Sequence, residues 1–276
     1  MKNRIIICIA LMVLGEPLLG QSPSLNTRDS INVFTQGLFM QKGEWEVKLY
    51  NNLYTQIEPQ FDNTTRRSSF NSSFLQLTIG SNKNINYGII LIYKSNVIND
   101  RGSSSPFVVF ELMNKSLQNI YMGNEFNTNF QHGLTHVGGR VRVKPFKNKR
   151  FTFQQAIYVP TGELDEGYII NSDLFYERII QNRYMLFGNI GAWYPLSGDI
   201  FPYARVFAGT LLAKRLGPFV MINLPYEVGA GTKIFITRKI ELEFMYTYWL
   251  PIEALVENRR PTSINFGVRI TNFNNF

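Results

Sequence analysis

The chain has 276 residues, a formal net charge of +8, 17% charged residues and 14% aromatic residues. Ordinary soluble domains carry nearer 25% charged residues, so this composition suits a barrel with a lipid-facing band and a polar interior. The single cysteine excludes a disulfide framework, and the only dense basic clusters, at Arg66-Arg67 and 147–150, lie beside turn signals, which argues against a nucleic-acid partner.

The N-terminus has the pattern of an export signal. Lys2 and Arg4 give a basic start, and an apolar run of about ten residues follows from Ile5. Such a run is too short to cross a bilayer as a helix, although a buried N-terminal helix is an alternative. We place cleavage after Gly20, which makes residues 1–20 a signal peptide and residues 21–276 a single exported domain without cysteine.

From Trp45 onward, apolar and polar residues alternate with period two, as in strands whose two faces meet different surroundings. In the segment 239–250, Ile240, Leu242 and Phe244 share one face, while Glu241 and Glu243 share the other. Similar segments recur along the chain, preceded by a possible short strand at 31–39. The predicted strands are 45–54, 75–80, 85–94, 136–144, 151–159, 168–178, 184–194, 203–212, 218–226, 227–236, 239–250 and 263–271.

The connections between these strands alternate in length. Tight turns are expected at 81–84, 146–149, 181–183, 213–217 and 237–238, and longer loops at 95–131, 160–169, 195–200 and 251–261. Short turns on one side and longer loops on the other are typical of a bacterial outer-membrane barrel. The sequence around Pro225 leaves almost no room for a turn, so the strand number could be between ten and fourteen.

The alternation alone fits either a soluble secreted β-sandwich or a membrane barrel. Strand length, loop alternation and aromatic residues near strand ends favour the membrane; these aromatic residues are Trp45, Tyr93, Tyr194, Tyr248 and Trp249. We therefore predict an all-β protein, a closed antiparallel transmembrane β-barrel of about 12 strands. It would lie in the outer membrane of a Gram-negative bacterium, with outer-membrane lipid around it.

Two hairpins resemble a known family. The segments GLTHVGGRVRVKPFKNKRFTFQQAIYVPTG (133–162) and VGAGTKIFITRKIELEFMYTYW (228–249) are similar to hairpins of small outer-membrane β-barrel proteins of the Bacteroidota type, and the chain ends on an aromatic residue, Phe276, as such barrels commonly do. This family is largely uncharacterised and porin-like. The resemblance therefore implies a fold and a location more than an activity.

Seven charged residues have the parity expected for the barrel lumen: Arg140, Arg142, Lys144, Lys233, Glu241, Glu243 and Arg269. They could pair into an ion network that fills a narrow interior, or they could line a small anion-preferring pore. Acids and bases on neighbouring strands favour the network. We also hypothesise that Arg140 and Arg142 set an anion preference.

Metal binding and catalysis have little support in the sequence. The only histidines, His132 and His136, would lie about 13 Å apart in a strand at ~3.3 Å per residue, with no cysteine or dense carboxylate set nearby. We predict no cofactor, no metal site and no catalytic residue.

The predicted function is that of a small pore or transport protein, and not of an enzyme. The alternative is a structural or accessory barrel subunit that docks other envelope proteins through the 95–131 loop, with a barrel enzyme a distant third. Bulky residues of inward parity argue for a filled interior; they are Phe74, Phe187, Trp193, Phe207, Phe235 and Trp249.

Overall fold

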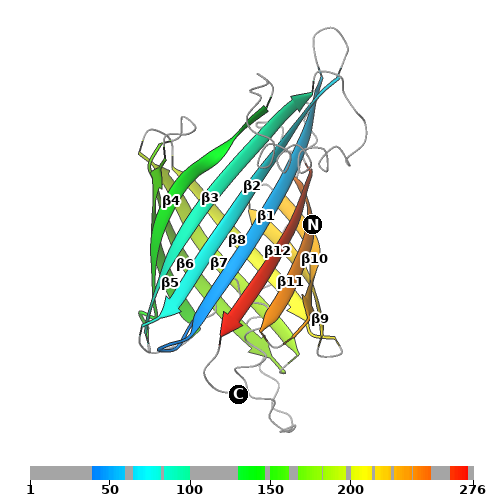
Figure 1. Ribbon diagram of the computed structural model, residues 1–276. Helices are drawn as coiled ribbons and strands as arrows, with labels where there is room; N and C mark the ends of the chain where they lie inside the picture. The colour runs from blue at the N-terminus through cyan, green and yellow to red at the C-terminus, as the bar shows by residue number, and fades with distance from the viewer. Residues whose placement is uncertain are drawn as a thin grey trace.

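The computed structural model is a closed barrel of antiparallel strands (Figure 1). The structure describes residues 39–59, 65–81, 84–99, 130–146, 150–161, 167–181, 183–196, 200–212, 215–224, 227–237, 239–249 and 262–272. The strands are β1 (Trp45–Pro59), β2 (Thr65–Gly80), β3 (Ile85–Asn99), β4 (Phe130–Val143), β5 (Phe151–Pro160), β6 (Ile169–Ile180), β7 (Tyr184–Pro195), β8 (Phe201–Thr210), β9 (Leu216–Leu224), β10 (Glu227–Phe235), β11 (Ile240–Trp249) and β12 (Thr262–Asn272).

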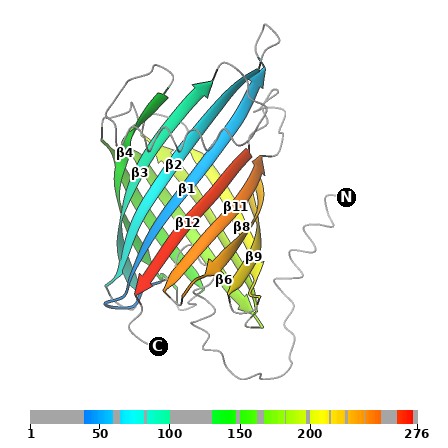
Figure 2. The same ribbon diagram turned by 45° about the vertical axis from the view of Figure 1, so that its right-hand side comes forward.

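Each strand pairs with its neighbours in sequence, and the first strand pairs with the last. β1 and β12 meet in antiparallel register from Trp45 opposite Asn272 to Thr55 opposite Thr262, which closes the barrel (Figure 2). The predicted closed antiparallel fold is confirmed, with twelve strands. Within the described part of the chain, no helix is long and apolar enough to cross a membrane.

The strand number is settled by the pairing of β9 with β10. β9 ends at Leu224, β10 begins at Glu227, and the two pair antiparallel from Asn223 opposite Glu227 to Leu216 opposite Ile234. The segments on either side of Pro225, which made the count uncertain, are therefore two separate strands, while residues 225 and 226 lie outside the described residues.

The outer face of the wall is apolar. Side chains that point outward stay exposed in the isolated barrel, for example Ile190 at 68%, Val220 at 56% and Phe244 at 47%. The same strands turn polar side chains such as Asn189 and Glu243 inward, where they are buried. This distribution is the reverse of that in a soluble barrel, and it gives the belt of apolar residues that an outer-membrane barrel presents to lipid.

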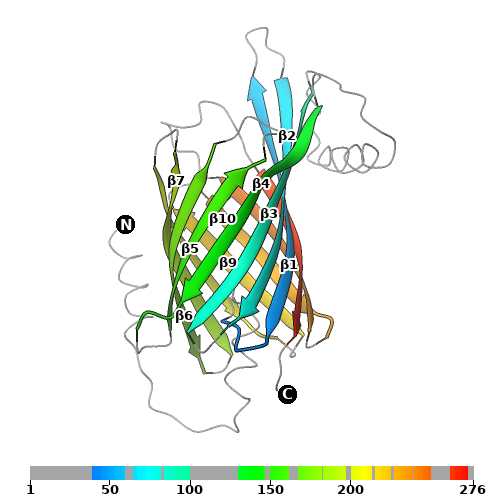
Figure 3. The ribbon, with the colours of Figure 1, turned by 60° about the vertical axis from the view of Figure 1, so that its left-hand side comes forward.

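The wall is taller on one side. β1, β2 and β3 have 15, 16 and 15 residues, whereas β9 and β10 have 9 each. About 9–11 residues of tilted strand cross a bilayer, so the longer strands continue past the rim, as Figure 3 shows for β1 and β2. The predicted loop at 95–131 is too long at both ends, because β3 continues to Asn99 and β4 starts at Phe130.

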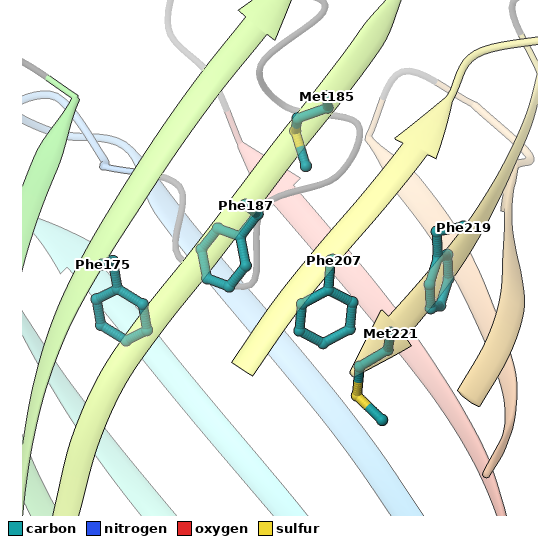
Figure 4. Packing of buried hydrophobic residues seen from close by; sticks show 6 residues of the cluster. All are labelled: Phe175, Met185, Phe187, Phe207, Phe219 and Met221. Carbon is teal, nitrogen blue, oxygen red and sulfur yellow. The ribbon is translucent and has the colours of Figure 1, made fainter. Parts of the chain in front are cut away.

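A row of apolar side chains lines the inside of β6 to β9 (Figure 4). Four phenylalanines on successive strands, Phe175, Phe187, Phe207 and Phe219, follow one another with ring centroids 5.7 to 5.9 Å apart. Met185 and Met221 complete this buried cluster, which we call the aromatic wall. It fills one side of the lumen, as the bulky inward residues predict.

Candidate functional site

A network of ion pairs lies inside the barrel where the first and last strands meet. We call it the seam cluster; its members are Glu46 and Lys48 of β1, Lys233 of β10, Glu241 and Glu243 of β11, and Arg269 of β12. All six are buried, with three acids against three bases. The seam cluster is therefore neutral as a whole. This balance is needed because an uncompensated charge buried in a narrow lumen is costly.

The contacts within the seam cluster join four strands. Lys233 Nζ lies 2.9 Å from Glu241 Oε1 and 2.8 Å from Glu243 Oε2. Arg269 is paired with Glu241 and lies 3.8 Å from Glu46, which is in turn 3.3 Å from Lys48. The Tyr50 hydroxyl donates to Glu243 Oε2 at 2.7 Å, across β12. The geometry is that of the ion network favoured by the sequence.

Arg140 and Arg142 form a separate group on β4, which we call the arginine pair. Their exposed fractions are 4% and 3%. Arg140 donates to Gln76 Oε1 at 2.9 Å and to Thr78 Oγ1, and Arg142 Nε donates to Gln154 Oε1 at 2.7 Å. All three acceptors are neutral. Among the described residues, no carboxylate lies within ion-pair distance of either guanidinium.

Arg140 reaches its partners because the residue that lies between them on β3, Gly88, has no side chain. Gly88 on β3 is opposite Arg140 on one side and Thr78 on the other. A Cβ atom at Gly88 would lie 2.6 Å from Arg140 Nε and 2.7 Å from the Leu77 carbonyl oxygen. The missing side chain lets the guanidinium cross β3 and bind two side chains of β2.

Between these groups lies a central cavity of about 300 Å³. The arginine pair and Arg205 line it, as do Trp193 and Tyr203. Asp173 also lines it, and its carboxylate accepts hydrogen bonds from Asn189 Nδ2 at 3.0 Å, Gln154 Nε2 at 3.1 Å and the Tyr203 hydroxyl. Phe175 and Phe207 of the aromatic wall give the lining an apolar surface.

The lower end of the barrel, where β12 finishes in Figure 1, holds a turn formed by residues 39–44. Glu44 N donates to the Gln41 carbonyl at 3.0 Å, and Gly43 has a φ of 82°, a value that favours glycine. Asn86, at the start of β3, accepts from Met40 N at 2.8 Å and donates to Met40 O at 2.7 Å. The turn thereby holds Met40, which is fully buried, against the inner wall.

The structure brings six of the seven predicted lumen residues into two places. Lys233, Glu241, Glu243 and Arg269 belong to the seam cluster, and Arg140 and Arg142 form the arginine pair. Lys144 follows the end of β4 at the lower rim, where its ammonium lies 4.5 Å from the centroid of the Phe39 ring. Glu46 and Lys48 were not among the predicted site residues, although their parity opposite Val47 and Leu49 is visible in the sequence.

His136 is buried with its ring between two oxygen atoms. Nδ1 lies 3.1 Å from Thr135 Oγ1, and Nε2 lies 3.0 Å from the Gly167 carbonyl oxygen. The described residues contain no group of three or more His, Cys, Asp or Glu side chains arranged to hold a metal ion. The His132 side chain, the signal peptide at 1–20 and most of the 95–131 loop lie outside the described residues, so the predictions about them stay predictions.

Comparison with solved structures assigns the fold to the barrels of bacterial outer membranes. An outer membrane channel from Pseudomonas putida F1 is similar over 84% of this chain and 97% of its own, with a TM-score of 0.59 and 9% sequence identity. This likeness concerns the fold alone. No protein-family model matches the chain, and no curated protein is detectably similar to it in sequence.

Two further barrels are similar at lower scores. The toluene transporter TodX of Pseudomonas putida matches over 83% of this chain and 89% of its own, with a TM-score of 0.43 and 8% identity. The translocator domain of the autotransporter NalP from Neisseria meningitidis matches over 97% and 95%, with a TM-score of 0.44 and 9% identity.

Proposed function

We propose that the protein is a channel for small solutes in the outer membrane of a Gram-negative bacterium, exported by a signal peptide at residues 1–20. The observation that carries this proposal is the reversal of polarity across the wall: an apolar outer face surrounds a cavity lined by arginine, asparagine and aspartate side chains. Large side chains and the 39–44 turn narrow the lumen, so the channel would pass small solutes only.

We further propose that the arginine pair makes the channel prefer anions. The seam cluster neutralises its own charge, whereas the arginine pair is held by neutral groups and keeps its positive charge beside the cavity. The membership in the Bacteroidota-type family is likewise a proposal, supported by the two quoted segments, which span β4–β5 and β10–β11.

The test uses the purified full-length barrel. Folded and boiled samples should migrate differently on a gel, and the folded protein should conduct in planar bilayers with a higher permeability for chloride than for potassium. The variant Arg140→Ala/Arg142→Ala should bring the two permeabilities close to each other. Recovery of the protein as a soluble periplasmic species would refute the membrane proposal, and an unchanged permeability ratio would refute the role of the arginine pair.

The alternative function, a structural subunit, depends on the 95–131 loop. Residues 100–129 of that loop lie outside the described residues, so docking of envelope proteins there stays a prediction.

A further inference from the structure

We propose that the central cavity is a binding site for a small carboxylate with an aromatic or apolar body. The carboxylate would lie on the arginine pair, and the apolar body would lie against Phe175 and Phe207. This inference deepens the proposed channel function, since it names the class of solute that the lumen selects.

The acids around the cavity have hydrogen-bond donors, whereas several N–H groups of its cations have no acceptor. Asp173 receives three hydrogen bonds, and Glu243 is bound by Lys233 and Tyr50. The third carboxylate of the lining, Glu227, accepts from Asn223 Nδ2 at 3.1 Å. The carboxylates of the cavity are therefore supplied with donors before any solute enters.

The arginines around the cavity, in contrast, have N–H donors without an acceptor. Arg140 Nε and Arg142 Nη1 are buried and have no hydrogen-bond partner in the structure, and the same holds for Arg205 Nε. A buried donor without a partner costs about 1–3 kcal/mol, and more when it carries charge. The two guanidiniums of the arginine pair also lie two residues apart on one face of β4, where their charges repel each other. An anion between them would relieve both costs.

The shape of the donors favours a carboxylate. Guanidinium groups present N–H donors in a planar fork that matches the two oxygens of a carboxylate. Gln76, Thr78 and Gln154 hold these forks in place, so that little side-chain freedom is lost when a solute binds.

The surface beside the arginine pair is apolar. The guanidinium carbon of Arg142 lies 5.8 Å from the centroid of the Phe175 ring, and Phe207, Met221 and Met245 continue this lining. A hydrated inorganic anion would leave that surface without a partner. A solute with a ring or a short alkyl body would cover it, and a cavity of about 300 Å³ is at the lower end of the range for ligand sites.

The experiment measures binding, by titration calorimetry, of benzoate to the full-length barrel in detergent, with protein-free micelles as the blank. Benzamide has the same ring without the charge, acetate has the carboxylate without the ring, and inorganic phosphate is an anion with neither a ring nor a carboxylate. We expect benzoate to bind at least about tenfold more tightly than each of the three. The variant Arg140→Gln/Arg142→Gln should weaken benzoate binding by about tenfold or more, while Lys239→Gln, an exposed cation on the β10–β11 turn, should not.

Each outcome decides the proposal. Equal binding of benzoate and benzamide, equal binding of benzoate and phosphate, or wild-type affinity in the arginine variant would overturn it. If the double variant does not fold, the comparison of the four probes on the wild-type protein still decides. Conductance without benzoate binding would leave the channel proposal intact and refute this one, whereas benzoate binding without conductance would do the reverse.

Discussion

At the scale of single residues, long side chains inside the barrel cross a glycine on the next strand and bind a polar group on the strand after it. Arg140 crosses Gly88 in this way, and Tyr203 crosses Gly191 to reach Asp173. A Cβ atom at Gly191 would lie 2.4 Å from Asp173 Oδ1 and 2.7 Å from the Tyr203 hydroxyl oxygen. The glycines thus decide which polar groups can meet across an intervening strand.

The variant Gly88→Ala tests this arrangement. The new methyl group would press on both Arg140 Nε and the Leu77 carbonyl, so we expect a loss of about 1–3 kcal/mol from overpacking and a displaced Arg140. The measurement is the temperature at which the folded gel band converts to the unfolded one. Gly139→Ala is the matched control, since a Cβ there meets nothing within 4 Å, and equal effects of the two changes would contradict the argument.

A second prediction concerns charge balance in the seam cluster. Glu241→Gln removes a partner from both Lys233 and Arg269 and leaves one uncompensated buried positive charge. Breaking a buried pair on one side typically costs about 3–5 kcal/mol, which urea unfolding in micelles would measure. The variant Glu241→Gln/Arg269→Gln restores neutrality and should be more stable than the single variant. A double variant less stable than the single one would refute the neutrality argument.

At the scale of elements, the 39–44 turn is the part of the structure that the sequence did not reveal. The sequence reading ended a possible strand at Phe39, and nothing in the residue pattern linked Met40 to Asn86, 46 positions away. The strands themselves were predictable, because period-two alternation is a local property. A contact between a turn and the inner face of a strand two places away depends on how β1, β2 and β3 pair, which local patterns do not encode.

The turn gives a third prediction. Asn86→Ala removes both hydrogen bonds that hold Met40, so the turn should leave the inner wall and widen the lower opening. We expect a larger single-channel conductance and a small loss of stability, about 1–2 kcal/mol for two hydrogen bonds. Gln41→Ala, which changes an exposed side chain of the same turn, is the control. An unchanged conductance in Asn86→Ala would show that the turn does not limit flow.

At the scale of the whole molecule, the fold followed from the sequence more completely than the site did. The alternation of Ile240, Leu242 and Phe244 with Glu241 and Glu243 places the first set outside and the second inside, as the structure confirms. The sequence did not predict that the lumen charges separate into a neutral seam cluster and an arginine pair that has no carboxylate partner among the described residues. It depends on which strands become neighbours and on glycines such as Gly88 that admit a crossing side chain.

The seam cluster also bears on how the barrel is assembled. Glu46 belongs to the first strand and its partner Arg269 to the last, so these two charges meet only when β1 and β12 pair. In an open sheet Glu46 would keep Lys48 but lose Arg269, and Glu243 would lose the Tyr50 hydroxyl. The final joining of the two edges therefore completes the polar contacts of the seam cluster, which favours an all-or-none insertion over a half-closed intermediate.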